Sequence, residues 1–426
     1  MNKLEYPALG EVLYRQVLSS GLTVLVVPRP GFSRKHAYFA TDFGSLHRDF
    51  LLEGQRYHIP AGTAHFLEHK MFDLPDGRDV NGELAALGTS ANAFTSYDMT
   101  AYYISGTDHF MESLSLLLEF VSTPCFSQES IEKEWGIIDQ EIGMHLDSPD
   151  SQVFERLMGI SYASHPIREP ILGTSESIRR ITPEILNACH RAFYTPGNMV
   201  LCVVGDVEPR EVSALAERVL GTGKRPVGEK LRAWPEEVTP LSQKTSTRME
   251  VAMPTFNLGF LCESVGTGET AVRRELVGDL AAEALLGESS RLYLELYNRG
   301  IIDSSFGGGF ETVDGMAMLL CSGDSCDPEA IRDAVLEEAK RLSAEGVAPD
   351  DFLRMKRSAM GRRIRSLDSF DSTCYRLCAC HMAQYDYFRF PELYRDITAG
   401  EIQEFLARVV LPQRCSLSVV EPLEEE

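Results

Sequence analysis

A weak internal repeat places the strongest constraint on how this chain can fold. From Ile181 to Pro209, a segment of helical periodicity leads into a β-branched run. The same order recurs from Ile397 to Pro422, so the two copies lie 216 residues apart at their start and 213 at their end. A repeat of this period predicts two homologous domains, each closing with a helix followed by a strand.

The chain is long enough for two such domains with a linker between them. Its 426 residues, 44% of them hydrophobic, can bury two substantial cores. We expect an N-terminal domain over 1–225, a linker over 226–243 and a C-terminal domain over 244–426. The residue pattern predicts an α+β fold, with a mixed sheet in each domain and helices on one face of it. Strands are predicted over 14–27, 37–43, 91–105, 200–204 and 306–321, and helices over 111–121, 131–146, 275–286, 290–299, 328–344 and 349–366.

The net charge narrows the classes of partner. A value of −22 argues against nucleic acid, because a phosphate-binding surface needs clustered Lys and Arg. The excess of acidic side chains suits cationic peptides, although solubility is the simpler explanation.

Apolar runs and cysteines bear on the compartment. The strongest apolar runs, 22–27 and 200–204, are far too short to span a membrane. The first residues show no secretory signal, and ten cysteines lack the spacing of a disulfide framework. We therefore expect a cytoplasmic protein with reduced thiols. Cys374 and Cys378 share a helical face and are better explained as small buried residues than as a second metal site.

The run His65-Phe66-Leu67-Glu68-His69 carries the chemistry. Residues four apart lie on one helical face, so both imidazoles can direct a ring nitrogen at one ion about 2 Å away. Glu68 then stays available as a general base for a water whose pKa the metal lowers to about 7. This geometry is typical of a zinc hydrolase.

Zinc needs a third protein ligand, and Glu141 is the first candidate. The segment from Ser127 to Leu146 begins with an N-cap residue and has apolar residues at helical spacing. Glu134 and Glu141 are seven apart and therefore share one face. Without further information, a carboxylate on such a helix is better explained as a solvated surface group.

The order of these residues resembles the pitrilysin/insulinase family of zinc metallopeptidases, the inverzincins, whose motif is H-x-x-E-H. Glu141 follows the motif after 71 intervening residues, and the resemblance covers most of the first third of the chain. It also includes Gly44-Ser45, the run 61–64, the run 81–84 and the run 88–95.

The resemblance implies a role for each of these residues. His65, His69 and Glu141 would bind one Zn²⁺, Glu68 would be the general base, and Glu134 would support the site behind the ligands. The implied fold is a clamshell whose two domains enclose a chamber. The implied activity is cleavage of short or unfolded peptides.

The resemblance also makes the segment 91–96 the edge strand to which a peptide substrate adds. The peptide would pair with the main chain of this strand, so Asn92, Ala93 and Phe94 are the expected substrate-binding residues, with Phe94 near the first specificity pocket. An ordinary half-buried strand is the alternative, and the segment can be both.

The second half departs from the family pattern. Members that are active alone usually carry an Arg and a Tyr seven apart, but Tyr297 stands at the Arg position here and Asp303 or Ser304 at the Tyr position. Losing both donors should cost roughly several kcal/mol of transition-state stabilisation. We therefore expect the zinc-bearing subunit of a heterodimer with a homologous chain, a homodimer being possible. Alternatively, Arg299 restores the charge after a one-residue deletion.

Three functions fit these residues. The favoured one is a zinc-dependent endopeptidase, because its ligands and base are all present. A binding or assembly subunit with little turnover is the alternative, and the altered Arg/Tyr pair argues for it. A metal hydrolase of another class is disfavoured by the match over Ala91 to Thr95.

Overall fold

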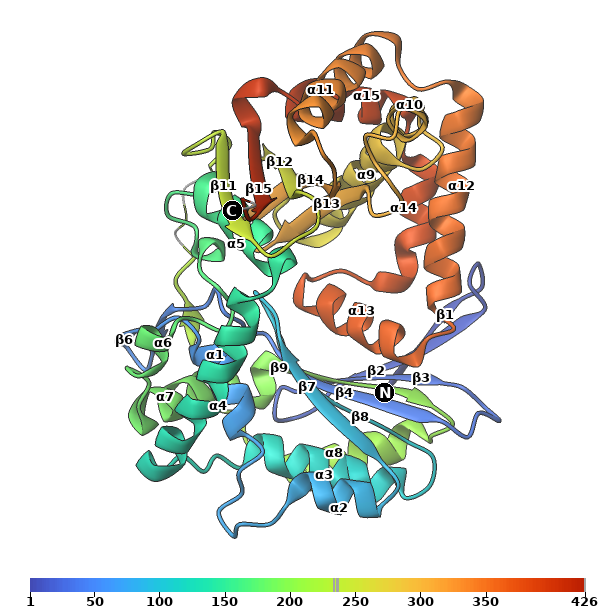
Figure 1. Ribbon diagram of the computed structural model, residues 1–426. Helices are drawn as coiled ribbons and strands as arrows, with labels where there is room; N and C mark the ends of the chain where they lie inside the picture. Colours follow the sequence, from blue (N-terminus) through green and yellow to red (C-terminus); the bar gives the residue numbers. More distant parts are fainter. Residues whose placement is uncertain (233, 235–236, 425–426) are drawn as a thin grey trace. The chain divides into compact units, whose positions relative to one another are not determined.

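The computed structural model describes residues 1–232, 234 and 237–424, which form two compact units (Figure 1). The first unit comprises residues 1–142, 170–232 and 363–390, and the second comprises the described residues of 143–169, 233–362 and 391–426. Each unit therefore includes a segment from the other half of the sequence. The domain boundaries at 225 and 244 stay a prediction, because contacts and homology divide a chain by different criteria. Ala233, Pro235 and Glu236 of the predicted linker lie outside the described residues.

The main sheet of the first unit has the order β1-β2-β3-β9-β4-β8-β7. The two strongest apolar runs become β3 and β9, which pair in parallel and are almost completely buried. The other neighbours in this sheet pair antiparallel. Its strands are β1 (Asn2–Tyr6), β2 (Glu11–Val17), β3 (Thr23–Pro28), β4 (Lys35–Thr41), β7 (Ser90–Thr95), β8 (Thr100–Gly106) and β9 (Met199–Gly205). A small sheet of order β10-β5-β6 is made by β5 (Asp49–Leu52), β6 (Gln55–His58) and β10 (Glu229–Lys230).

The sheet of the second unit repeats this topology. Its order, β11-β15-β12-β14-β13, has one parallel pair at the same place as β3 and β9. The repeat found in the sequence supplies the corresponding strands, β9 and β15. The mixed α+β fold with two related sheets is therefore confirmed. The strands are β11 (Lys244–Met249), β12 (Thr255–Cys262), β13 (Gly307–Val313), β14 (Met316–Asp324) and β15 (Cys415–Pro422).

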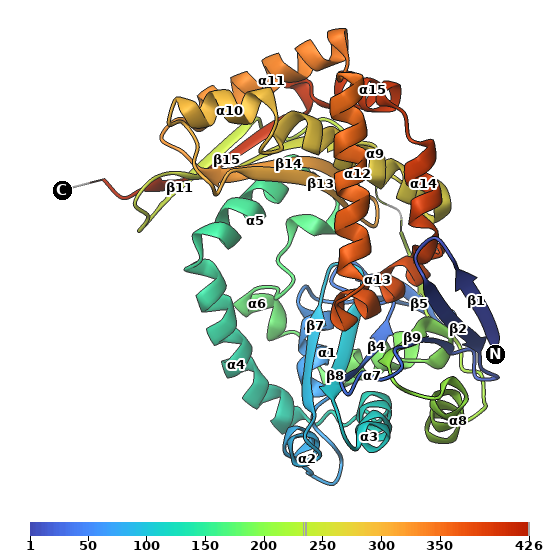
Figure 2. The ribbon, with the colours of Figure 1, turned by 90° about the vertical axis from the view of Figure 1, so that its right-hand side faces the viewer.

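Helices cover one face of each sheet as expected, and one further helix lies on the opposite face. In the first unit, α3 and α8 pack below the sheet and α13 packs on β4 and β9 from the other side (Figures 1 and 2). In the second unit, α9 and α15 cover one face and α5 lies against β11, β12 and β15. The exchanged segments carry these extra helices, since α13 comes late in the sequence and α5 early. The helices of the first unit are α1 (Thr63–Lys70), α2 (Val80–Ala86), α3 (Phe110–Ser122), α6 (Ser175–Ile178), α7 (Pro183–Phe193), α8 (Pro209–Leu220) and α13 (Phe370–Met382). Those of the second are α5 (Pro149–Ser161), α9 (Gly268–Leu286), α10 (Arg291–Asn298), α11 (Pro328–Glu345) and α15 (Ala399–Val409). Three helices span unit boundaries: α4 (Gln128–Leu146), α12 (Pro349–Ser366) and α14 (Phe390–Asp396).

Among residues 1–232, 234 and 237–424, none of the helices combines the length and the apolar character that crossing a bilayer requires.

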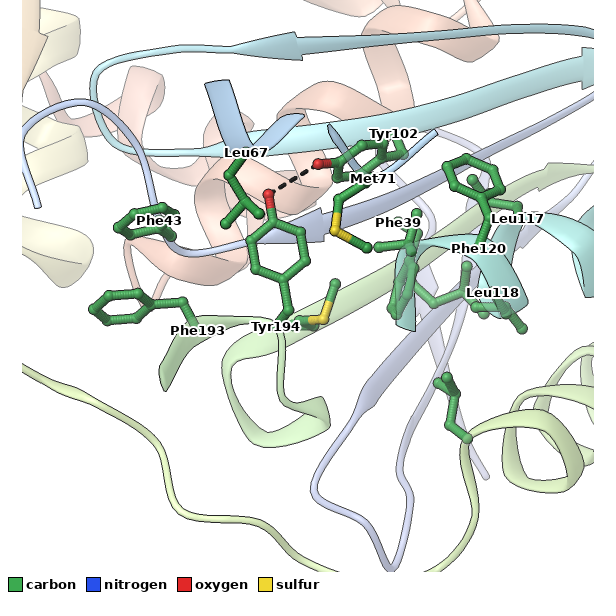
Figure 3. Packing of buried hydrophobic residues seen from close by; sticks show 14 of the residues in the cluster. Phe39, Phe43, Leu67, Met71, Tyr102, Leu117, Leu118, Phe120, Phe193 and Tyr194 are labelled. Atoms are coloured by element: carbon green, nitrogen blue, oxygen red, sulfur yellow. Dashed lines mark hydrogen bonds between the residues drawn. The ribbon is translucent and has the colours of Figure 1, made fainter. Parts of the chain in front are cut away.

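The core of the first unit holds the motif helix in place. Leu67 and Met71 project from this helix into a cluster of buried rings (Figure 3). The rings of Phe43 and Phe193 stack with centroids 4.4 Å apart. A hydrogen bond of 2.9 Å joins the hydroxyls of Tyr102 and Tyr194 in the same cluster. Large rings fill such a core densely, so the helix has little freedom to shift.

Candidate metal centre

Two glycines fix where the motif helix α1 begins. Gly62 precedes the helix with φ of 88°, and a Cβ there would lie 2.5 Å from the carbonyl oxygen of Leu172. Gly173 has φ of 73°, and a Cβ there would lie 2.6 Å from the carbonyl oxygen of Ala61. Only glycine tolerates this conformation and this contact without strain. The Ser177 hydroxyl donates to the carbonyl of Ala61 at 2.9 Å and completes the junction.

The two faces of α1 have opposite characters. Phe66 and Leu67 are fully buried on one side. His65 and His69 lie one turn apart, with ring centroids separated by 4.6 Å. Burial of the apolar side therefore sets the direction in which both imidazoles point.

The predicted third ligand meets these imidazoles. Glu141 lies on α4, and its Oε2 is 3.7 Å from Nε2 of His65 and 3.7 Å from Nε2 of His69. The three ligand atoms all lie within 4.8 Å of one another. In the described part of the chain this is the one His/Cys/Asp/Glu group with such geometry. Packing has thus brought together Glu141 and a motif from which 71 intervening residues separate it in the sequence.

The separations suit a zinc ion. Tetrahedral coordination with bonds of about 2.1 Å places ligand atoms about 3.4 Å apart, close to the 3.7 Å found here. Two nitrogens and one carboxylate oxygen also match the donor set of catalytic zinc sites, which leave one position open. His65, His69 and Glu141 therefore form a group that could hold one metal ion.

Glu68 lies beside this group with its side chain largely buried. Only 8% of the residue is exposed, and the Thr95 hydroxyl donates to its Oε2 at 2.7 Å. Burial raises the pKa of Glu68, and the nearby charge of Glu141 adds to the rise. The hydrogen bond from Thr95 and the charge of His69 oppose it. The carboxyl group is held in one orientation, as a proton-transfer group requires.

Glu134 contacts the ring nitrogen of His69 that lies opposite the one near Glu141. Its Oε1 is 3.0 Å from Nδ1 of His69, and its Oε2 accepts from the ammonium of Lys70 at 3.1 Å. Burial by itself would raise the pKa of Glu134, but the His69 and Lys70 contacts outweigh it and lower the pKa. Burial would lower the pKa of His69, but the bond to Glu134 and the surrounding carboxylates raise it. A carboxylate on Nδ1 of this kind leaves Nε2 available to a metal.

The predicted substrate strand is β7, at the edge of the main sheet. The Ser96 amide bonds to the Met99 carbonyl at 2.7 Å, so by alternation the main-chain groups of Ala93 face away from β8. Consistently, the Ala93 amide donates to the side-chain oxygen of Asn92 at 2.9 Å. This edge therefore presents main-chain groups to which another strand can bond.

Phe94 projects to the face of the sheet on which α13 lies. Its ring is 6.1 Å from Tyr38, 6.4 Å from Tyr103 and 6.0 Å from Tyr375. Successive residues of a strand point to opposite faces, so Thr95 turns toward α1 while Phe94 joins this aromatic group.

The residues at the altered Arg/Tyr positions lie in the second unit. Tyr297, near the end of α10, is exposed and stacks on Tyr293 with centroids 5.8 Å apart. Arg299 follows the helix, and its guanidinium lies 3.6 Å from Glu295. Asp303 accepts a hydrogen bond of 2.7 Å from the Ser305 amide.

The sequence did not single out Thr95 and Lys70 as neighbours of the centre. Thr95 was part of the family match, and its position directly after the predicted substrate-binding residues could have indicated that it lies near the centre. Lys70 directly follows the motif, and a lysine beside buried helix residues could have been suspected of having a carboxylate partner. The buried positions predicted for Cys374 and Cys378 are confirmed.

The comparisons agree with this geometry. Residues 53–175 match the family described as insulinase (peptidase family M16), and residues 180–359 match the one described as peptidase M16 inactive domain. A Bacillus subtilis protein described as uncharacterized zinc protease YmfH is 32% identical over 426 residues, covering 98% of this chain and 99% of that protein. A second B. subtilis protein, described as uncharacterized zinc protease YmxG, is 25% identical over 386 residues, covering 87% and 91%.

Solved structures show the same fold. A crystal structure of an M16-like peptidase from Alicyclobacillus acidocaldarius superposes with a TM-score of 0.93 and 31% identity, covering 99% of this chain and 100% of that one. The peptidase M16 inactive domain from Pseudomonas fluorescens superposes with a TM-score of 0.78 at 18% identity, covering 97% and 99%.

Proposed function

Because the chain belongs to the insulinase family, peptidase family M16, we propose that it is a zinc-dependent endopeptidase acting on short or unfolded peptides. One observation carries the proposal: His65, His69 and Glu141 converge on one point, with the carboxyl group of Glu68 beside them. The names of the relatives support zinc as the metal.

Each residue of the centre has a defined task in this proposal. When bound, zinc supplies Lewis-acid chemistry, lowering the pKa of water and polarising a carbonyl group. Glu68 accepts the proton of the attacking water and passes it to the leaving amine. Thr95 orients the Glu68 carboxyl, and Glu134 holds His69 so that its Nε2 faces the metal.

The peptide would bind by adding a strand to β7. The outward main-chain groups of Ala93 would bond to it once the Asn92 side chain released the amide. Residues of an added strand alternate in direction, so one side chain would face α1 while the next would face the aromatic group around Phe94. A peptide must be extended to bind in this way, which favours short or unfolded substrates.

A second, homologous chain is part of the proposal. Tyr297 stands at the Arg position, and Asp303 or Ser304 stands at the Tyr position, of the pair that would stabilise a developing oxyanion, so a partner could supply both donors. Arg299 is the alternative source of positive charge within the chain.

We also propose that the protein is cytoplasmic. All ten cysteines are free thiols, which is the state expected in a reducing compartment.

The deciding experiment is cleavage of a mixed, quenched peptide library by the zinc-loaded chain. It is run alone and with a homologous chain that carries the Arg and Tyr, and Glu68→Gln is the blank. We expect cleavage with the partner. Cleavage by the chain alone would contradict the divided site and favour Arg299.

The alternative function, a binding or assembly subunit, predicts a different result in the same assay. A binding or assembly subunit would hold zinc and bind peptides without cleaving them in either arrangement. The match of residues 180–359 to an inactive domain favours keeping this alternative in the test. If no peptide is cleaved by the chain alone or with the partner, but peptides bind measurably, the binding or assembly function replaces our proposal.

A further inference from the structure

Lys70 is buried directly behind the candidate metal centre. It follows His69 at the end of α1, and only 3% of its side chain is exposed. Lysine is almost never buried to this degree unless its charge is paired, because removing an ammonium group from water costs several kcal/mol. The contacts that pair it therefore define its role.

A continuous line of polar contacts connects Lys70 to a metal ligand. Its ammonium contacts Asp73 and also lies 3.1 Å from Oε2 of Glu134. The other oxygen of Glu134 is 3.0 Å from Nδ1 of His69. On the far side, the Ser130 hydroxyl donates to Asp73 at 2.5 Å. Each oxygen of Glu134 thus has one partner, and the carboxylate cannot rotate without breaking a charged contact.

This line also ties the two helices of the centre together. Lys70 and His69 belong to α1, whereas Ser130 and Glu134 lie one turn apart on α4. Glu141 lies two turns beyond Glu134 on the same face of α4. The contacts that hold Glu134 against α1 therefore also fix the position of Glu141 relative to α1.

A cavity next to Lys70 gives its ammonium group a further role, which is to keep water away from Glu134. A hollow of about 520 Å³ is lined by residues that include Lys70, Asp73, Lys133 and Glu134. Without the ammonium group, water from this hollow could hydrate Glu134 and compete with its bond to His69. An ordinary buried ion pair would affect only the stability of the fold. The pair of Lys70 with Glu134 differs, because the same Glu134 carboxylate also contacts His69.

We infer that Lys70 is a positioning residue of the metal centre, which sets the affinity for zinc by holding Glu134 against His69. The inference rests on the metal site of the proposed function and not on peptide cleavage. A chain that bound zinc without cleaving any peptide would leave it intact.

The test measures zinc affinity by competition with a chelator, on the purified full chain. We expect Lys70→Met to weaken zinc binding by about tenfold or more, the size typical of losing a partner behind a ligand. Because Lys70→Met leaves Asp73 and Glu134 without their cation, a double variant Lys70→Met/Asp73→Asn restores the local charge balance. It should show the same loss while folding more readily.

A matched control comes from the same helix. Lys133 neighbours Glu134 in sequence, but its side chain is 74% exposed and pairs with Glu129 at 2.8 Å. Lys133→Met should therefore leave zinc affinity within about twofold of the parent chain.

A mutant cycle with Glu134 distinguishes positioning from simple stability. If Lys70 acts through Glu134, Lys70→Met should weaken zinc binding little further once Glu134→Gln is present. Losses that multiply in the combined variant would overturn the inference. So would wild-type zinc affinity in the charge-balanced double variant.

Discussion

Glu68 shows how one carboxyl group is adapted by its surroundings. Burial and the charge of Glu141 raise its pKa, while Thr95 holds one of its oxygens at 2.7 Å. A group that must accept and then release a proton benefits from a pKa closer to neutrality than that of a solvated glutamate. Its position next to His69 in the sequence places Glu68 near the candidate ligands His65, His69 and Glu141, and Glu68 is not part of that group.

Glu68→Gln should retain zinc and lose peptide cleavage. Glutamine keeps the shape and can still accept from Thr95, but it cannot take a proton from water. We expect turnover to fall by about two to four orders of magnitude, with zinc content unchanged. Turnover and metal content are measured on the same preparation, and normal turnover would exclude Glu68 as the base.

Glu141→Ala should lose stoichiometric zinc. Two imidazoles remain, and a site with two protein ligands falls short of the three that catalytic zinc centres use. Glu132→Ala is the matched control, because Glu132 lies on the same helix and bonds to Gln128 away from the centre. Metal analysis after dialysis checks both variants. Tight zinc in Glu141→Ala would point to Glu134 as the third ligand.

The junction before α1 depends on a backbone conformation. Gly62→Ala would place a Cβ 2.5 Å from a carbonyl oxygen at a φ of 88°, so the entry to the helix must shift. We expect a loss of about 2 kcal/mol or more in the free energy of unfolding, together with weaker zinc binding. Gly136→Ala in α4 is the control, because it has open space and should stabilise the helix by up to about 1 kcal/mol. Denaturant titration of the two variants should give opposite signs.

The edge strand β7 can be altered at its outward groups alone. Ala93→Pro would remove an amide that faces away from β8, and edge strands tolerate proline at such places. We expect kcat/KM for peptides to fall by about tenfold, with zinc affinity and Tm retained. Unchanged kinetics in a folded, zinc-loaded variant would mean that peptides do not pair with this strand.

The stability of the whole chain depends in part on three buried histidines of the first unit, of which one lies on β4 and the others on α7 and α13. His36, His190 and His381 have pKa values lowered to about 4, chiefly by burial. In the unfolded chain their pKa returns to about 6.5. Each therefore stays neutral in the folded protein over a range in which the unfolded chain takes up a proton.

Stability should consequently fall as the pH drops from about 6.5 to about 4. In this window the unfolded state binds more protons, so the free energy of unfolding decreases with acid and recovers fully above pH 6.5. For His190 the loss is on the order of 3 kcal/mol. His190→Phe should flatten the dependence in denaturant titrations at several pH values. Equal slopes for variant and parent would show that His190 does not contribute.

Local patterns were enough to predict much of this protein. The motif His65 to His69, the strands at 22–27 and 200–204 and the repeated closing helix and strand all depend on near neighbours, whose periodicity the sequence displays directly. His65 and His69 followed from the spacing of the motif, whereas the family resemblance favoured Glu141 as the third ligand. The geometry brings all three together.

Other features arise from contacts between distant segments. The pattern around Glu141 alone favoured a surface group, and its approach to His65 and His69 depends on how α4 packs against α1. A carboxylate partner for Lys70 could have been suspected from its place after the motif, but that Glu134 is this partner depends on how α4 packs against α1. The exchange of α5 and α13 between the units was equally invisible, because a helix displays its apolar face in sequence but not the sheet it will cover.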